Sequence, residues 1–209
     1  MKIAVKGPIG VGKSIFCKKI KTFFPTFKVY IEPSFENPFI EKYYENPKDI
    51  CYDIDKYLIK HRIEVDKKAN EDIKNGYIVI LDTSIFSSYY YIYSNYKYEK
   101  NLTKKQYKEL KQMIDEYIKN MKHKPNLEIE LHCSEKTCFS RIRLRNAENN
   151  NLECENKIPL LYLKNQIKAI KHLTKKIEIY GIKTKCIDWE NFDHGNNNKM
   201  YYKTILGIK

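Results

Sequence analysis

The sequence predicts an α/β domain in three layers, with helices on both faces of a five-stranded parallel sheet. Two observations support this prediction. Short apolar runs alternate along the chain with segments of helical length and period. Residues suited to phosphate chemistry follow the first three runs, namely the loop 7–14, Glu32 and Asp82. Because the carboxyl ends of parallel strands meet at one edge of a sheet, we expect these residues to form one site there.

The first predicted unit is a strand, "KIAVK", a glycine-rich loop and a helix that begins "SIFCKKI". Glycines let the backbone N–H groups of such a loop turn inward around phosphate oxygens, where a β-carbon would interfere. Lys13 would reach the terminal phosphates of a nucleotide, and Ser14 would ligate Mg²⁺. The predicted phosphate-binding residues are Gly7, Pro8, Ile9, Gly10, Val11, Gly12, Lys13 and Ser14.

Four further strands follow in order. "KVYIEP" (28–33) ends at a proline, "YIVILD" (77–82) follows an Asn-Gly turn, and "LEIELHC" (127–133) and "KTKCIDW" (183–189) are short β-runs. The segments between them have helical spacing, as in Leu110, Met113, Ile114, Tyr117, Ile118 and Met121. A chain of 209 residues fits a single domain, 1–209.

The charge of the chain does not by itself select a partner. Its net charge of +13 would suit nucleic acid but equally suits a polyanionic nucleotide. The basic residues are mostly lysines spread over the whole chain, which indicates a solvated surface, so a nucleic-acid partner is not expected.

The expected cellular compartment follows from sequence features that are missing. No apolar run approaches the roughly 20 residues of a membrane span, and the first residues lack a signal-peptide pattern. We therefore expect a cytoplasmic protein with no membrane partner. The six cysteines form no CxxC pair, so free thiols are expected and zinc is not.

Three longer stretches, 32–62, 81–88 and 138–148, together with 7–14, resemble the deoxynucleoside kinase family, and most closely its bacterial deoxyadenosine/deoxyguanosine kinase branch. The resemblance implies a P-loop kinase fold with a helical lid at about 138–158. It also implies ATP with Mg²⁺ as donor, a deoxyribonucleoside as acceptor and a homodimer. The Glu of Glu-Pro, here Glu32, would be the general base for the 5′-hydroxyl of the nucleoside.

The resemblance also assigns other residues. Tyr44 would bond the 3′-hydroxyl of the sugar, and Asp82 would lie at the substrate and the metal. Arg141 and Arg145, four apart on one helix face, would close over the donor phosphates. Aromatic and polar residues that could shape the base pocket are Ser34, Phe35, Phe39 and Tyr52.

Two positions depart from the family pattern. The arginine that normally holds the 5′-hydroxyl and the base carboxylate is replaced by Thr83, so activity is weakened or another residue substitutes. Ala147 stands at the second arginine of the lid motif. The glutamate for the 3′-hydroxyl is Glu155 when counted back from Ile158-Pro159. The acids Glu148 and Glu153 are the alternatives.

A third departure is Asp55, where the family has the glutamine that reads the base. An ionised carboxylate only accepts hydrogen bonds, so Asp55 suits adjacent donors. Guanine offers N1–H and the 2-amino group side by side, which weakly favours a purine and deoxyguanosine in particular. The alternative is that Asp55 points into solvent or forms a salt bridge.

The leading hypothesis is thus an ATP-dependent deoxynucleoside kinase. A nucleoside-monophosphate kinase would need further cationic residues for the phosphate of its acceptor. A catalytically weak nucleotide-binding partner subunit is suggested by Thr83 and Ala147.

Overall fold

The computed structural model describes residues 1–33, 37–148, 150–178, 180–190 and 198–208, without the side chains of 148, 150–153 and 176–178. All five predicted strands form, somewhat shorter than expected for the second and third. They are β1 (Lys2–Lys6), β2 (Lys28–Tyr30), β3 (Val79–Leu81), β4 (Leu127–His132) and β5 (Lys183–Asp188). Every pairing is parallel, in the order β2-β3-β1-β4-β5, which confirms the predicted sheet.

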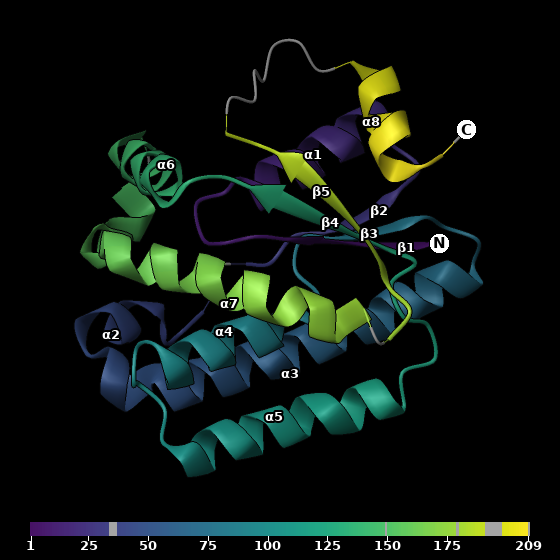
Figure 1. The fold of residues 1–209 in the computed structure, drawn as a ribbon. Coiled ribbons are helices and arrows are strands. Elements are labelled where there is room, and N and C mark those ends of the chain that lie inside the picture. Colours follow the sequence, from purple (N-terminus) through teal and green to yellow (C-terminus); the bar gives the residue numbers. More distant parts are fainter. Residues whose placement is uncertain (34–36, 149, 179, 191–197, 209) are drawn as a thin grey trace.

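Helices cover both faces of this sheet (Figure 1), which confirms the three-layer prediction. The helices α1 (Lys13–Phe23) and α8 (Lys199–Leu206) lie on one face. The other face carries α3 (Pro47–Lys74), α4 (Ser87–Lys97), α5 (Lys104–Lys119) and α7 (Leu160–Glu178). Beyond the carboxyl ends of the strands lie α2 (Ile40–Glu45), α6 (Glu135–Glu148) and the 3₁₀ segment η1 (Asn150–Lys157).

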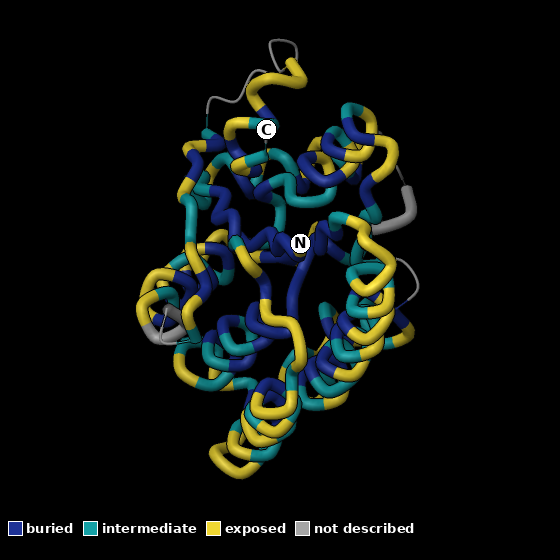
Figure 2. The backbone as a smooth tube through the Cα atoms, turned by 90° about the vertical axis from the view of Figure 1, so that its right-hand side faces the viewer, coloured by how far each residue is buried: buried dark blue, intermediate teal, exposed yellow. Residues whose placement is uncertain are grey.

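Hydrophobic clusters hold these layers together, and two of them are large. The first contains β-strand residues and the aromatic cluster of Phe16, Trp189 and Tyr202, whose ring centroids lie 5.3 and 5.4 Å from that of Phe16. The second lies among α3, α4, α5 and α7 and includes Ile59 and Ile114. Figure 2 shows the central strands buried and the outer sides of the helices exposed. Within the described residues, no helix is both long and apolar enough to cross a membrane.

The central position of β1 decides where the phosphate loop lies. Ala4 of β1 pairs with Leu81 of β3 on one side and with Glu128 of β4 on the other. The loop that leaves β1 therefore emerges next to the end of β3 and so next to Asp82, which is the arrangement that the sequence predicted.

A buried ion pair fixes the opposite end of β1. The ammonium of Lys2, which is 1% exposed, lies 2.7 Å from Asp66 Oδ1 on α3. It also donates to Asn70 Oδ1 at 2.8 Å and to the carbonyl of His123 at 2.7 Å. Burial lowers the pKa of Lys2, and the carboxylate of Asp66 acts against this shift. The pair thus ties the sheet to α3.

We predict that Asp66→Ala lowers the free energy of unfolding by about 3–5 kcal/mol, because it leaves the ammonium of Lys2 buried without its carboxylate. Urea unfolding followed by circular dichroism measures this loss. Glu71→Ala on the same helix is the control, because it removes only an exposed pair with Lys74 and should cost less than about 1 kcal/mol. Equal losses in the two variants would contradict the prediction.

Candidate active site

The glycine-rich loop adopts backbone conformations that only glycine tolerates well. Gly10 has φ 79°, and a β-carbon there would lie 2.5 Å from the carbonyl oxygen of Cys138 on α6. Gly12 precedes α1 with φ 101° and gives the helix no side-chain cap. The N–H groups at the start of α1 are thus available to an anion, as a phosphate site requires.

Lys13 lies inside this loop. Its Nζ donates to the carbonyl oxygens of Gly7 and Pro8, each at 3.1 Å. Burial lowers the pKa of Lys13, but the nearby Tyr91, Asp82 and Glu32 together outweigh it, so the pKa lies above its ordinary value. The ammonium is therefore charged at neutral pH and is held at the loop that would receive the phosphates.

Ser14 and Asp82 meet at the end of β3. The hydroxyl of Ser14 donates to Asp82 Oδ2 at 2.6 Å, and Asp82 is 2% exposed. Burial raises the pKa of Asp82, and its Oδ1 is buried with no hydrogen-bond partner in the described part of the chain. Carboxylate and hydroxyl oxygens are ligands that Mg²⁺ prefers, so these two residues fit the predicted metal site.

Glu32 follows β2 and lies beside Asp82, since its backbone N–H donates to Asp82 Oδ2 at 3.4 Å. Its carboxylate is gripped by Arg62 of α3, with Nε 2.7 Å from Oε1 and Nη2 3.1 Å from Oε2. Burial by itself would raise the pKa of Glu32. Arg62, and after it Lys13, lower the pKa by more than burial raises it, so the pKa lies below its ordinary value. Glu32 is therefore ionised at neutral pH, as a general base must be.

Our sequence reasoning missed Arg62, although a signal was present. Only four of the 39 basic residues are arginines, and the other three, Arg141, Arg143 and Arg145, lie together in the predicted lid. An arginine in a chain that otherwise uses lysine marks a position where a planar fork of donors is needed. The reasoning also missed Tyr91, whose hydroxyl donates to the carbonyl of Gly7 at 3.3 Å and whose ring lies 5.0 Å from the guanidinium of Arg62.

Asp55 is 4% exposed and accepts from Asn95 Nδ2 at 2.9 Å through Oδ2. The thiol of Cys51 reaches the same oxygen at 3.6 Å. Within the described residues no cation lies within 4.0 Å of this carboxylate, so Asp55 is neither solvated nor in a salt bridge. Burial raises the pKa of Asp55 to about 6.

Tyr44 lies on α2 and Glu155 in η1, and these two segments pack against each other. Burial raises the pKa of Tyr44, and Tyr162 and then Glu155 raise it further. Glu155 is 4% exposed and forms an ion pair with Arg145. The role of Glu155 at the sugar 3′-hydroxyl stays a prediction, and the side chains of the alternatives Glu148 and Glu153 lie outside the described part.

The two lid arginines make different contacts. Arg141 Nη1 donates to the carbonyl of Val11 at 2.9 Å, and Nη2 donates to the carbonyl of Trp189 at 2.8 Å, so this arginine lies against the phosphate loop. Arg145 instead pairs with Glu155. In this arrangement only Arg141 is next to the loop, and their shared role at the phosphates stays a prediction.

The predicted pocket residues are only partly accounted for. Ser34 and Phe35 lie outside the described residues. Phe39 packs against Tyr57, with ring centroids 5.8 Å apart, and the hydroxyl of Tyr52 donates to Glu109 on α5 at 3.0 Å. Tyr52 is thus engaged with α5.

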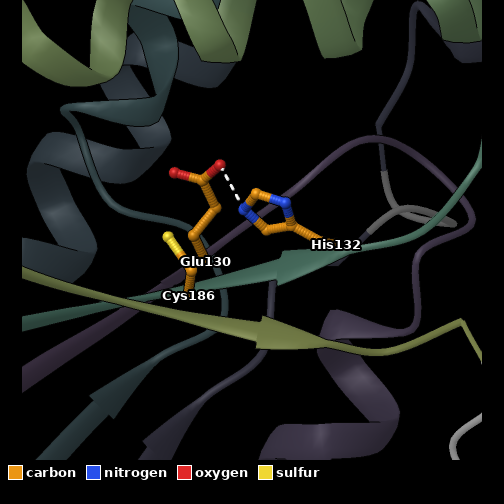
Figure 3. Close-up of side chains that lie close together, drawn as sticks. All are labelled: Glu130, His132 and Cys186. Atoms are coloured by element: carbon orange, nitrogen blue, oxygen red, sulfur yellow. Dashed lines mark ion pairs between the residues drawn. The ribbon is translucent and has the colours of Figure 1, made fainter.

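A separate group of possible metal ligands lies on one face of β4 and β5 (Figure 3). Glu130 and Cys186 are register partners, and His132 Nε2 lies 2.6 Å from Glu130 Oε1. The other oxygen of Glu130 lies 2.9 Å from the buried ammonium of Lys6. Because both oxygens of Glu130 are engaged, we interpret this group as an ion-pair network and assign no metal to it.

The loop, the charged Lys13, the Ser14–Asp82 pair and the ionised Glu32 define a P-loop phosphotransferase. The sequence matches the family "Deoxynucleoside kinase" over residues 3–205, and the chain belongs to that family. It is 27% identical over 191 residues to a deoxyguanosine kinase of Dictyostelium discoideum, a match that covers 91% of this chain and 64% of that protein. It is also 27% identical over 180 residues to a deoxyguanosine kinase of Bacillus subtilis (strain 168), with 84% and 79% covered.

Solved structures support the fold. The deoxyadenosine kinase of M. mycoides with bound dCTP superposes with a TM-score of 0.80 at 23% identity, covering 100% of both chains. The same kinase with bound dATP gives a TM-score of 0.76 at 24% identity, covering 99% of both chains. These likenesses confirm the P-loop kinase fold that the sequence predicted.

We predict that Lys13→Ala lowers phosphoryl transfer on the order of 10²-fold or more, because a preorganised positive charge on the terminal phosphates is lost. Single-turnover kinetics with labelled ATP measures the effect. Lys18→Ala, an exposed position on the same helix, is the control. A Lys13→Ala variant with most of the wild-type rate would overturn the assignment of the phosphate loop.

Proposed function

We propose that the protein transfers the γ-phosphoryl group of ATP to the 5′-hydroxyl of a deoxyribonucleoside. The observation that carries the proposal is the ionised Glu32, whose carboxylate accepts two hydrogen bonds from Arg62 and whose backbone N–H donates to Asp82. An uncharged acceptor hydroxyl needs a carboxylate of this kind to take its proton. Membership of the deoxynucleoside kinase family supports the same reading.

Each residue then has a defined task. The N–H groups of the loop and Lys13 bind the β- and γ-phosphates, and Arg141, already against Val11, neutralises charge from the lid side. Glu32 accepts the proton of the 5′-hydroxyl while the hydroxyl oxygen attacks the γ-phosphorus in line. The bond from that phosphorus to the bridging oxygen breaks, and ADP leaves. Tyr44 and Glu155 hold the 3′-hydroxyl. Ser14 and Asp82 would hold Mg²⁺, which would supply positive charge at the phosphates when bound.

A nucleoside-monophosphate kinase is less well supported. Its acceptor carries a phosphate that needs cations of its own. The cations that act on Glu32 are Arg62 and Lys13, with a contribution from His61. Arg62 is occupied by Glu32 and Ser88, and Lys13 belongs to the phosphate loop. A homodimer and a cytoplasmic location stay predictions from the sequence.

The base that we propose is guanine. Asp55 Oδ2 is taken by Asn95 and Cys51, while no hydrogen bond from the described residues reaches Oδ1. An ionised carboxylate with a free oxygen can accept from N1–H and the 2-amino group of guanine. Two of the relatives reported above are named deoxyguanosine kinases, which supports this choice.

The test of the activity is a transfer assay with labelled ATP and Mg²⁺, offering each of the four deoxyribonucleosides and each of their 5′-monophosphates in turn. The proposal expects deoxynucleoside 5′-monophosphate as the product, and loss of that product in Lys13→Ala. Transfer to monophosphates alone would establish the rival kinase. Transfer to none of the eight would favour a nucleotide-binding partner subunit.

We predict that Glu32→Gln keeps ATP binding and lowers turnover by about 10²–10⁴-fold, because the amide preserves shape but cannot accept the proton. Binding of a fluorescent ATP analogue and kcat are measured on the same preparation. Glu71→Gln, an exposed carboxylate on α3, should change neither quantity. Normal turnover in Glu32→Gln would place the base elsewhere, with Asp82 as the first candidate.

We predict that the preference for deoxyguanosine over deoxyadenosine, as a ratio of kcat/KM values, falls when the pH is lowered through about 6. Protonated Asp55 both donates and accepts, and so matches N1 and the 6-amino group of adenine. The ratio cancels pH effects that are common to both substrates.

Asp55→Gln should move the same ratio toward adenine at all pH values, by roughly 10-fold to 1,000-fold. Asp53→Asn, a change on the exposed side of α3, is the control. An unchanged ratio in Asp55→Gln would mean that Asp55 does not read the base.

A further inference from the structure

The arginine missing from position 83 has a replacement in space. The family resemblance places an arginine directly after Asp82, where it holds the base carboxylate, but this chain has Thr83. Thr83 is 6% exposed and its hydroxyl has no hydrogen-bond partner among the described residues. The contact that an arginine at 83 would make is present all the same, because Arg62 reaches Glu32 from α3.

We infer that Arg62 is the positioning residue of the catalytic base, and that it has taken over the role of the missing arginine at position 83. This inference rests on the proposed role of Glu32. It concerns how the base is held in place. Thr83 is then no sign of weakened activity, because the arginine function has moved from position 83 to position 62.

The geometry of Arg62 suits this role. Two of its nitrogens face the two oxygens of Glu32, and the third, Nη1, donates to the hydroxyl of Ser88 on α4 at 2.9 Å. The ring of Tyr91 lies 5.0 Å from the guanidinium carbon. Arg62 is 4% exposed, so these contacts leave it little freedom. A lysine would provide one charge but not the parallel pair of bonds that fixes the carboxylate plane.

The charges around Glu32 explain why an arginine is needed. Arg62 and His61 face it from α3 and Lys13 from α1, while Asp82 approaches from the end of β3. Lys13 must neutralise phosphate during the reaction, so it cannot serve Glu32 alone. Without Arg62, the carboxylate of Glu32 would lose the two hydrogen bonds that hold it in place beside Asp82.

The position of Arg62 in α3 adds a link to the base pocket. Asp55 and Arg62 are seven residues apart, which is two helical turns, so they lie on one face of α3. The charge of Arg62 also lowers the pKa of Asp55, against the larger effect of burial. One rigid helix therefore sets both the residue that we propose reads the base and the residue that holds Glu32.

The experiment compares Arg62→Gln, Arg62→Lys, Arg62→Gln/Thr83→Arg and Glu32→Gln in steady-state kinetics with the best deoxynucleoside and saturating Mg²⁺-ATP. Arg62→Gln should lower kcat by about 10²-fold and change the KM for the deoxynucleoside by less than about threefold, because the base is misplaced while the nucleoside still binds. Arg62→Lys should also lose kcat, because one ammonium cannot replace the parallel pair of bonds to the carboxylate. Lys67→Gln, exposed on the same helix, removes one charge and should change neither.

The double variant gives the most specific test. Adding Thr83→Arg to Arg62→Gln should recover at least about 10-fold in kcat, because a second route brings a guanidinium back to Glu32. A loss of kcat in Arg62→Gln that Thr83→Arg does not recover would overturn the inference. If Arg62→Gln fails to fold, Arg62→Lys and the double variant still decide, because wild-type kcat in Arg62→Lys, or no activity in a folded double variant, would each count against it.

Failure of the proposed function gives a different result. If Glu32→Gln turns over normally, Glu32 is not the base and the premise falls. If Glu32→Gln is inactive while Arg62→Gln keeps wild-type kcat, the base assignment stands and only the role of Arg62 falls.

Discussion

The ion pair between Glu32 and Arg62 is the interaction on which the candidate active site depends. It joins the end of β2 to the middle of α3 and, through Ser88, to α4. Its charge balance keeps a half-buried carboxylate ionised next to Asp82, a second buried carboxylate. Two acids this close to each other require cations, and Lys13 and Arg62 supply them from opposite sides. The phosphate loop, the predicted metal ligands and the base are therefore electrostatically linked.

The parallel sheet makes this link possible, because β1 lies in the centre and directs the phosphate loop toward the ends of β2 and β3. The order of the strands brings Ser14, Glu32 and Asp82 into one cluster at a single edge of the sheet. Glu32 lies 18 positions after Ser14 in the sequence, and Asp82 lies 50 positions after Glu32. The helix pair α3 and α4 then closes the other side with Arg62 and Tyr91. Stability and function are thus spread over the same elements, since α3 also carries Asp66, the partner of Lys2 at the far end of the sheet.

Much of the fold could be predicted from the sequence, because it depends on local patterns. The glycine spacing before Lys13, the short apolar runs and the helical periods each report local structure, and all five strands form where expected. Glu32 and Asp82 could be assigned to one edge because strand ends in a parallel sheet coincide. The second and third strands, β2 and β3, are shorter than predicted, since Glu32 and Asp82 belong to the connections that follow them.

Arg62 could not be predicted in the same way, because its contact with Glu32 joins residues 30 positions apart and depends on the length and packing of α3. The different contacts of Arg141 and Arg145 could not be predicted either, because they depend on Glu155, which pairs with Arg145.

The most direct test of the account is a crystal structure with deoxyguanosine and a non-hydrolysable ATP analogue. The account predicts that Glu32 accepts a hydrogen bond from the 5′-hydroxyl while both nitrogens of Arg62 still hold its carboxylate. A 5′-hydroxyl bound elsewhere, or an Arg62 that leaves Glu32 when substrate binds, would contradict it.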